Sequence, residues 1–450
     1  MSIFKACDIR APYPDELQDH HAIALGRAIV RLQGPGEVVV AGDGRISTPK
    51  LKQLLINSLL ASGAQVIDLG VVPTPVFYYA RHHLGIKTGV MVTASHNPPQ
   101  YNGFKLALSD LPITEMEMNL LRKIMESTDI RLTNSVGEKI DVDILPDYLA
   151  FAQSQISSCS NLRIVVDYGN GMAALTGPRL WNHCGAEIIP LFDVIDGHFS
   201  NRSPNPAVPQ HLTALALAVQ KHHAHLGVAY DGDADRMAIV DEQGRFVPTD
   251  KVIALFARHL LQNTPAPVVY DQKCSRLVPE IIRDSGGEPI MEKSGHTFIK
   301  TTFLKETAIY AGELSGHHFF RALPQGDDGV MASIYFAEML VQSGLPLSEL
   351  WQSLPSYPNT PDIRLPMSSK QADAVLEQLT QAFADIGKLS FLDGVRVELA
   401  DSWGLARKSV TEPLLTLRFE GEDRNALRKI IANFENAAPT LAGRLPQVQR

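Results

Sequence analysis

A loop near residue 95 places a nucleophile at the exit of an apolar run. Val90-Met91-Val92 leads directly into Thr93-Ala94-Ser95-His96-Asn97-Pro98. A serine hydroxyl at the end of a strand is a candidate for covalent catalysis. Taken alone, this composition favours a structural turn, because Ser, His, Asn and Pro are common in loops. The functional interpretation therefore depends on what other loops contribute.

Three further loops carry side chains that handle metals, sugar hydroxyls or phosphate. The segment 231–236, Asp-Gly-Asp-Ala-Asp-Arg, offers three carboxylates at alternate positions, and hard oxygen ligands of this kind favour Mg²⁺ or Ca²⁺. The segment 312–317, Gly-Glu-Leu-Ser-Gly-His, offers an acceptor and a hydroxyl between glycines. The segment 407–413, Arg-Lys-Ser-Val-Thr-Glu-Pro, combines a planar guanidinium fork with two hydroxyls, which suits a phosphate.

An EF-hand is the main alternative for the aspartate loop. Its three aspartates and Glu242 match the first, third, fifth and last acidic positions of that motif. However, Arg236 stands where an EF-hand needs glycine, and the flanking segments 227–230 and 237–240 have the pattern of strands rather than helices. We therefore predict a Mg²⁺ site, and a solvated acidic turn remains as the other interpretation.

Together the four loops resemble the signature loops of the α-D-phosphohexomutases, closest to the bacterial phosphomannomutase/phosphoglucomutase branch. They extend from Ser95 to Pro413, so the resemblance covers nearly the whole chain. It implies that Ser95 carries a phosphate in the resting active enzyme, that this phosphate completes the shell of a Mg²⁺ ion, and that Lys105 takes part in proton transfer. A hexose 1,6-bisphosphate is the implied intermediate and activator.

The resemblance also implies a set of site residues. The catalytic group consists of Ser95, His96, Lys105 and Arg236, and the metal ligands are Asp231, Asp233, Asp235 and Ser95. The substrate-binding residues are Arg10, Lys273, His296, Glu313, Ser315, His317, Arg407, Ser409 and Thr411. Without the resemblance, Lys105 would be interpreted as a solvated surface lysine, and Lys273 or His296 as structural.

A serine hydrolase is disfavoured by the residues around the nucleophile. Adjacent residues of an extended chain point their side chains to opposite sides, so His96 is not expected to serve as the base for Ser95. No Gly-x-Ser-x-Gly elbow surrounds the serine either.

The chain departs from the family pattern at two places. Val410 stands where Asn or Gly is usual, which removes a possible donor and makes a positive φ costly. Cys7 and Ala11 stand where Tyr and Gly are usual, while Arg10 is retained. Both differences bear on the affinity for phosphate.

The elements that must position these loops form an internal repeat. Three times along the chain, a β-branched run leads into a polar loop. Each time, this loop is followed by a segment of helical length and then by a glycine that begins a second apolar run. A third apolar run comes after it. The first runs are 38–40, 164–166 and 268–270, the second follow Gly63, Gly185 and Gly286, and the third are 89–92, 227–230 and 308–311. Ser95, the aspartate loop and the Glu313 loop come directly after the third runs, at equivalent positions.

Strands that alternate with helical segments predict three similar α/β domains with largely parallel mixed sheets, whose ligand loops lie beyond the carboxyl ends of strands. The last part of the chain has a different pattern, with amphipathic helices over 371–386 and around Leu427 to Phe434, and strands at 395–399 and 415–419. We predict a C-terminal α+β domain and one central cleft. The expected domains are 1–144, 145–246, 247–358 and 359–450.

Composition narrows the class of protein. The chain has 450 residues, 45% of them hydrophobic and 20% charged, which is typical of a globular protein of about three domains. A net charge of −8 argues against nucleic acid or an acidic membrane as a partner. The four cysteines are far apart and suggest neither a zinc site nor a disulfide framework, and the N-terminus lacks a signal-peptide core. We expect a soluble, cytoplasmic monomer, with a dimer as the alternative.

The resulting hypothesis is an isomerase that interconverts mannose 1-phosphate and mannose 6-phosphate, with glucose phosphates as possible further substrates. The resemblance implies that Glu313 and Ser315 bind the 3- and 4-hydroxyls of the sugar. Such contacts do not sense carbon 2, where glucose and mannose differ, so phosphoglucomutase stays open, as does phosphoglucosamine mutase. From another class, a non-catalytic sugar-phosphate binding paralogue is the alternative.

Overall fold

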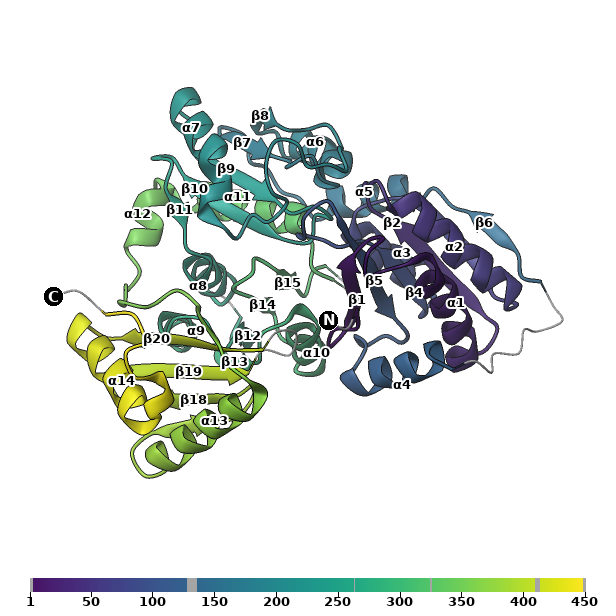
Figure 1. The fold of residues 1–450 in the computed structure, drawn as a ribbon. Coiled ribbons are helices and arrows are strands. Elements are labelled where there is room, and N and C mark those ends of the chain that lie inside the picture. The colour runs from purple at the N-terminus through teal and green to yellow at the C-terminus, as the bar shows by residue number, and fades with distance from the viewer. Residues whose placement is uncertain (1–2, 128–135, 263, 324–325, 409–412, 448–450) are drawn as a thin grey trace.

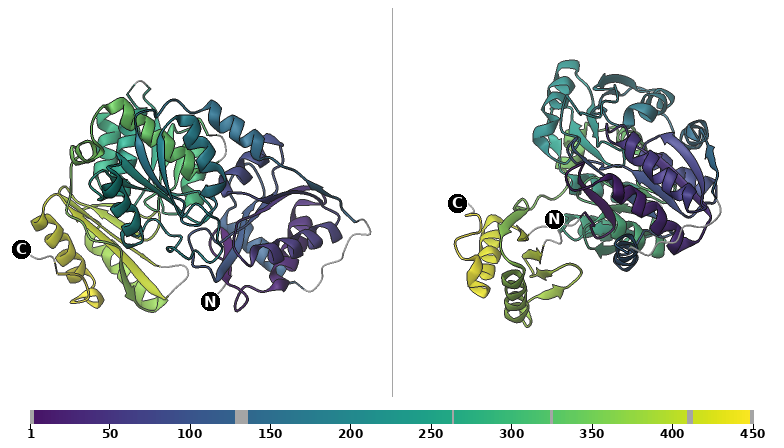
Figure 2. Two further views of the ribbon diagram at one scale, coloured as in Figure 1. Left: turned by 90° about the horizontal axis from the view of Figure 1, so that it is seen from above. Right: turned by 45° about the vertical axis from the view of Figure 1, so that its right-hand side comes forward.

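The computed structural model describes residues 3–127, 136–262, 264–323, 326–408 and 413–447. Three α/β domains and a C-terminal α+β domain follow one another along the chain (Figure 1), which confirms the predicted fold class. The views in Figure 2 show that the C-terminal domain, in yellow, lies to one side of the other three. None of the helices in these described ranges is both long enough and apolar enough to cross a membrane.

The first domain has a six-stranded mixed sheet in the order β1-β5-β4-β2-β3-β6. Its middle strands are fully buried, because helices cover both faces. Its strands are β1 (Asp8–Pro12), β2 (Glu37–Gly42), β3 (Gln65–Val71), β4 (Gly89–Val92), β5 (Tyr101–Ala107) and β6 (Lys139–Asp141). Its helices are α1 (Asp19–Gln33), α2 (Thr48–Ala61), α3 (Thr74–His83) and α4 (Glu115–Met125).

The second domain has a five-stranded sheet in the order β11-β10-β9-β7-β8. Its strands are β7 (Arg163–Asp167), β8 (Glu187–Leu191), β9 (Leu226–Tyr230), β10 (Met237–Asp241) and β11 (Phe246–Val247). Its helices are α5 (Leu145–Ser154), α6 (Ala173–Cys184), η1 (Pro209–Leu212) and α7 (Thr213–His222).

The third domain has a four-stranded sheet in the order β13-β12-β14-β15. Its strands are β12 (Pro267–Asp271), β13 (Glu288–Glu292), β14 (Tyr310–Gly312) and β15 (His318–Phe320). Its helices are α8 (Thr249–Leu260), α9 (Leu277–Asp284), α10 (His296–Lys305), α11 (Gly329–Ser343) and α12 (Leu347–Gln352).

The repeat predicted from the sequence is present in the sheet topology. In each domain the first strand lies between the second and the third, all parallel, and a fourth strand returns antiparallel beside the third. The equivalent orders are β3-β2-β4-β5, β8-β7-β9-β10 and β13-β12-β14-β15. The turn between the third and fourth strands is therefore the same structural position three times, and it carries Ser95, the aspartate loop and the Glu313 loop.

The C-terminal domain has a five-stranded antiparallel sheet in the order β16-β20-β19-β18-β17, with two helices packed on it. The predicted helices and strands are all found, but three strands had no clear pattern in the sequence: β16, β17 and β19. The elements are β16 (Ile363–Pro366), α13 (Ser369–Phe383), β17 (Lys388–Ser390), β18 (Val395–Glu398), β19 (Ser402–Lys408), β20 (Leu414–Gly421), α14 (Arg424–Ala437) and η2 (Pro439–Leu441).

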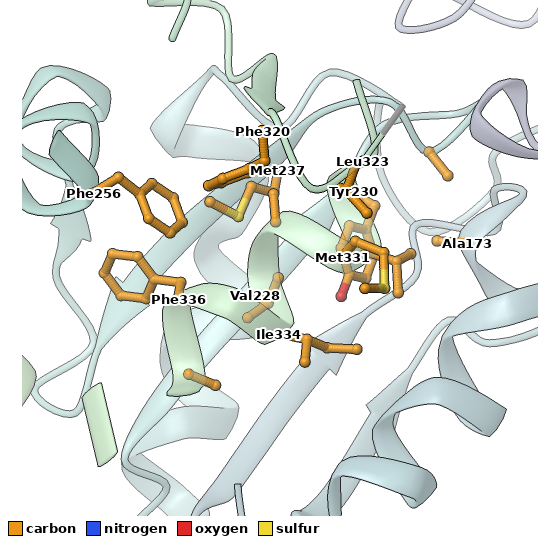
Figure 3. Close-up of a cluster of buried hydrophobic side chains, with 14 of the residues drawn as sticks. Ala173, Val228, Tyr230, Met237, Phe256, Phe320, Leu323, Met331, Ile334 and Phe336 are labelled. Atoms are coloured by element: carbon orange, nitrogen blue, oxygen red, sulfur yellow. The ribbon is translucent and has the colours of Figure 1, made fainter. Parts of the chain in front are cut away.

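Helix α11 connects the second and third domains through a shared core. Figure 3 shows Met331 and Ile334 of this helix beside Val228 and Tyr230 of β9. A buried hydrogen bond of 2.7 Å between Tyr230 Oη and Ser333 Oγ adds a polar contact. The sequence division at 246/247 does not capture this sharing, since α11 follows the third-domain sheet in the chain and packs on the second-domain sheet.

The exact domain limits stay a prediction. The first, third and C-terminal sheets each fall within one predicted segment, which supports the division, whereas β11 crosses the limit set at residue 246.

The expectation about the cysteines is wrong for two of the four. Cys159 and Cys184 form a disulfide across 25 residues, and only Cys7 and Cys274 are free. Cys159 precedes β7 and Cys184 ends α6, so the fold brings together two residues that no local spacing pattern connects.

Candidate active site

A cleft of about 720 Å³ is lined by residues from all four domains. The first two domains contribute residues that include His96 and Arg236, and the third contributes residues that include Lys273 and Ser315. The fourth domain contributes Asp362 and Arg418. The three repeat loops thus meet at one place, as expected for loops beyond equivalent strand ends.

Ser95 lies in the turn between β4 and β5, where its backbone has a positive φ of 49°. The side chain is buried, with 1% of the residue exposed, and its Oγ donates a hydrogen bond of 2.7 Å to Asp231 Oδ2. The nucleophile of the first domain therefore contacts the aspartate loop of the second.

His96 corrects one argument made from the sequence. Its Nδ1 lies 3.3 Å from Ser95 Oγ, so the two side chains do not point apart. The left-handed backbone of Ser95 is the reason, because the alternation of side chains holds only for extended residues. Burial, with the nearby charges of Arg236 and Arg10, holds the pKa of His96 well below its usual value.

Arg45 shapes the serine loop and was not among the predicted site residues. Its guanidinium donates to the carbonyl oxygens of Ser95 at 2.7 Å and Asn97 at 2.6 Å. Asp43 pairs with Arg45 and also accepts from Thr93 Oγ1 at 2.7 Å. This buried pair follows β2 in the Gly-Asp-Gly-Arg segment, so two strand ends of one sheet build the loop.

The three aspartates of the second-domain loop form a group that fits a divalent cation. Oxygen atoms of Asp231, Asp233 and Asp235 lie within 4.8 Å of one another, and all three residues are buried. Asp233 Oδ1 and Asp235 Oδ1 have no hydrogen-bond partner among the described residues. Buried carboxylate oxygens without partners are costly unless a cation neutralises them. Strands rather than helices flank the loop, which agrees with rejection of an EF-hand.

Lys105, on β5, extends from the first domain into this acidic group. Its Nζ donates to Asp233 Oδ2 at 2.7 Å and also pairs with Asp235 Oδ2. Burial alone would lower the pKa of Lys105, but these two carboxylates raise it well above the usual value. Lys105 is thus a buried cation rather than the surface lysine that its sequence context suggests.

The aspartates of this group differ in pKa, because each is surrounded by different charged side chains. Burial, together with the charges of Asp235 and Asp233, raises the pKa of Asp231 well above its usual value. Burial acts in the same direction on Asp235, but Lys105, His317 and Arg236 together outweigh it and lower the pKa of that residue to about 2. Asp231, the partner of Ser95, is therefore the most readily protonated of the group.

Arg236, His317 and Asp327 form a buried polar group next to the aspartates. Arg236 Nε donates to His317 Nε2 at 2.8 Å, and His317 Nδ1 lies 2.5 Å from Asp327 Oδ2. Nε2 of His317 is the acceptor in the contact with the arginine. Asp327 was missed by the sequence analysis; the only signal is an acidic pair between Gly326 and Gly329 before α11.

The sugar-binding candidates of the third domain lie around the group formed by Arg236, His317 and Asp327. Glu313 and Ser315 occupy the turn between β14 and β15, and Ser315 Oγ is buried without a partner among the described residues. The ring of His296 stacks on that of His317, with centroids 5.2 Å apart. Burial is the main cause that lowers the pKa of His296 to about 3, so its imidazole is neutral.

Lys273 faces the fourth domain across the cleft. Its Nζ lies 3.2 Å from Asp362 Oδ2, and Arg418 lies 3.9 Å from the other oxygen of the same carboxylate. Arg418 and Asp362 line the cleft although neither was predicted from the sequence.

The remaining described residues predicted to contact phosphate or sugar lie around the cleft rather than in its lining. Arg10 donates to Asn97 Oδ1 at 2.8 Å, which places it beside the serine loop. Arg407 pairs with Asp393, and its buried Nε has no partner among the described residues. Arg407 does not line the cleft itself. Ser409 and Thr411, like Val410, lie outside the described residues.

Comparison with known proteins agrees with this geometry. Profiles described as phosphoglucomutase/phosphomannomutase alpha/beta/alpha domains I, II and III match residues 1–131, 146–244 and 248–357, and the C-terminal domain of the same family matches 363–437.

Full-length relatives are similar over nearly the whole chain. A phosphomannomutase/phosphoglucomutase of Pseudomonas aeruginosa is 38% identical over 451 residues, covering 99% of this chain and 97% of the relative. A phosphoglucomutase of Neisseria gonorrhoeae is 36% identical and covers 96% of each chain. The crystal structure of a phosphoglucomutase/phosphomannomutase family protein from Burkholderia thailandensis has a TM-score of 0.90 at 36% identity, covering 99% and 98% of the two chains. The chain therefore belongs to the phosphoglucomutase/phosphomannomutase family, whose members are isomerases.

Proposed function

We propose that the chain is a phosphohexomutase that interconverts mannose 1-phosphate and mannose 6-phosphate and also acts on the glucose phosphates. The observation that carries the proposal is the contact between Ser95 Oγ and Asp231 Oδ2, 2.7 Å, inside a buried group of three aspartates. Such an arrangement places one hydroxyl where a transferred phosphoryl group and a cation share the same pocket. The names of the relatives support both sugars.

The proposed cycle uses Ser95 as a phosphate carrier. Phosphoserine gives its phosphoryl group to the free 6- or 1-hydroxyl of the bound sugar, so the bond from phosphorus to Ser95 Oγ breaks and a bond to the sugar oxygen forms. The sugar hydroxyl loses its proton, and His96, whose lowered pKa leaves it neutral, is positioned beside Oγ to accept one. The bound 1,6-bisphosphate then turns end for end and returns its other phosphoryl group to Ser95.

Positive charge supports this transfer. A bound Mg²⁺ held by Asp231, Asp233 and Asp235 would neutralise charge on the transferred phosphoryl group. Lys105, kept cationic by two carboxylates, adds a fixed charge at the same place. Arg236 is fixed by His317 so that its guanidinium stays next to Asp231, with Nε 3.7 Å from Oδ2.

Sugar recognition falls to the third and fourth domains in this proposal. Glu313 and Ser315 are placed to bind vicinal hydroxyls, and the unpartnered Ser315 Oγ supports that role. Lys273 and Arg418, which line the cleft, and Arg407, which lies outside its lining and pairs with Asp393, supply cations for the phosphate that is not being transferred. We further propose a cytoplasmic monomer.

A coupled assay tests the function. Purified protein with Mg²⁺ and catalytic hexose 1,6-bisphosphate receives mannose, glucose or glucosamine 1-phosphate, and formation of each 6-phosphate is followed. We expect turnover of the first two. Turnover of glucosamine 1-phosphate alone would make the chain a phosphoglucosamine mutase.

The binding-only alternative needs a separate readout. Phosphopeptide mass spectrometry of the purified protein should find phosphate on Ser95, because a protein that only binds sugar phosphates has no use for it. No phosphate on Ser95, together with no turnover of any of the three sugars, would favour the non-catalytic paralogue.

A further inference from the structure

A second cavity, of about 370 Å³, lies between the third and fourth domains. No residue lines both this cavity and the catalytic cleft. One wall comes from β12, α9 and β13, and the other comes from β17, β18, β19 and the loop between the last two strands. In Figure 1, α9, β12 and β13 lie beside β18 and β19. Its size is within the range of small-molecule sites.

Arg276 is a fixed cation on the third-domain wall. Its Nε donates to Glu280 Oε1 at 2.8 Å, and its Nη1 donates across the domain boundary to the carbonyl of Ala400 at 3.3 Å. The face of its guanidinium lies over the ring of Tyr357. Its Nη2 makes no hydrogen bond to any residue in the described ranges.

Arg396 is the corresponding fixed cation on the fourth-domain wall, with only 3% of the residue exposed. Its Nε donates to Glu398 Oε1 at 3.0 Å, and its Nη1 crosses the boundary to the carbonyl of Gln272 at 2.5 Å. The guanidinium lies 3.8 Å from the ring centroid of Trp403. Two arginines thus come from opposite walls, each held by a carboxylate and a carbonyl.

Two more cations at the cavity have no compensating charge. Arg283, on α9, and Lys388, on β17, line the wall, and neither side chain forms an ion pair or hydrogen bond within the part of the chain that is described. The hydroxyl of Tyr270 is similarly without a partner there, although the residue is only 6% exposed. A phenol that opens into a cationic cavity is a ready donor for an anion.

The charge balance identifies the kind of ligand. The cavity has four cations, Arg276, Arg283, Lys388 and Arg396, and only two carboxylates, each already bound to an arginine. Partly enclosed positive charge of this kind attracts anions with more than one negative charge, and guanidinium groups suit phosphate oxygens. We propose that this cavity is a second anion site, for a small phosphate-bearing polyanion that contacts the third and fourth domains together.

This site is separate from catalysis, so its test does not depend on the proposed mutase activity. Calorimetric titration with pyrophosphate, in EDTA and with the cleft saturated by glucose 1-phosphate, measures binding by the complete protein. The test variant is Arg283→Gln/Lys388→Gln, which changes two exposed side chains. The matched control is Lys305→Gln/Lys429→Gln, which removes the same charge from exposed positions outside the cavity.

We expect the test variant to bind pyrophosphate roughly tenfold more weakly than the wild type, because two charge-assisted contacts are lost. The control should bind like the wild type, and titration with glucose 1,6-bisphosphate instead of pyrophosphate would show whether a phosphorylated sugar is accepted. Equal binding by all three proteins, equal weakening in both variants, or no binding by the wild type would each overturn the assignment.

Discussion

At the residue scale, Ser95 combines a reactive hydroxyl with a buried acidic neighbour. Ser95→Ala should lower turnover by orders of magnitude, since the phosphate carrier is lost. Binding of hexose phosphate should persist, because the sugar-side residues of the third and fourth domains are unchanged. Steady-state assay and calorimetry of one preparation measure both quantities. Near-normal turnover in a preparation free of contaminating mutase would refute a phosphoserine mechanism.

Asp233 tests the metal site at the same scale. Asp233→Asn removes a negative charge but leaves an oxygen that can still accept from Thr74 Oγ1, now 2.7 Å from Oδ2. We expect turnover to fall by orders of magnitude without a change in the unfolding temperature, and EDTA should have the same effect on the wild type until Mg²⁺ is restored. Asp193→Asn, an exposed position in the same domain, is the control. Full activity of chelated protein would show that the aspartate loop is structural.

The residues that sequence reasoning missed share one property. Arg45 and Arg418 contact residues that are distant in the chain, Asp327 contacts His317 across β15 and the loop that follows it, and the segments around all three carry no recognisable motif. The four signature loops could be predicted because each is local. The contacts of Arg45 with the carbonyl oxygens of the serine loop depend on β2 lying beside β4, which only topology provides.

The His96 argument failed for a related reason. The rule of alternating side chains applies only to extended backbone. Nothing in the sequence Thr93-Ala94-Ser95 predicts the positive φ that the serine has. Cys159 and Cys184 were missed for a similar reason. Strand β7 and helix α6 lie between them in the chain, and only the fold brings the two sulfur atoms together.

At the element scale, the start of α11 touches the metal loop. Gly329 N donates to the carbonyl of Ala234 at 3.0 Å, and a Cβ at this glycine would lie 2.5 Å from the carbonyl oxygen of Arg236. Gly329→Ala should therefore displace the loop and lower kcat at least tenfold, a change of about 1.4 kcal/mol in the barrier. Gly36→Ala, where a Cβ meets nothing within 4 Å, is the control. Unchanged kcat would mean that the loop moves without cost.

The N-cap of α11 gives a pH prediction. Asp328 accepts from the backbone of Val330 and Met331 and from Tyr148 Oη at 2.6 Å, and burial raises its pKa to about 6. A carboxyl with a raised folded-state pKa binds protons more readily when folded, so its contribution to stability is present at low pH and is lost as pH rises from about 4 to 6.

Asp328→Asn keeps an acceptor but does not titrate. The unfolding temperature of the variant relative to the wild type should therefore increase between pH 4.5 and pH 7, by an amount that corresponds to at most about 3 kcal/mol. Thermal unfolding at both pH values measures it. A difference that stays constant, or that decreases as pH rises, would show that Asp328 is not titrating in this range.

At the scale of the whole molecule, the disulfide between Cys159 and Cys184 bears on the stability of the second domain. Closing a loop of 25 residues reduces the entropy of the unfolded chain, which stabilises the fold by about 3.5 kcal/mol in the chain-entropy model. Reduction with a phosphine, or Cys159→Ser, should lower the unfolding temperature. Cys7→Ser, a free cysteine in the first domain, is the control. Identical melting with and without reductant would indicate that the pair is not oxidised in the purified protein.

The distribution of the apolar cores has a mechanical consequence. One core extends from Val39 through the second and third domains to Leu354, whereas the fourth domain has a core of its own, from Leu365 to Leu445. The first three domains thus share an apolar core, and the fourth is joined to them by residues 355–362 and by polar contacts such as Lys273 with Asp362. Swinging the fourth domain outward would break ion pairs but expose no shared apolar interior. In the proposed cycle the bisphosphate must reorient within the cleft, and an outward swing of the fourth domain is the movement that would make room for it while exposing the least apolar surface.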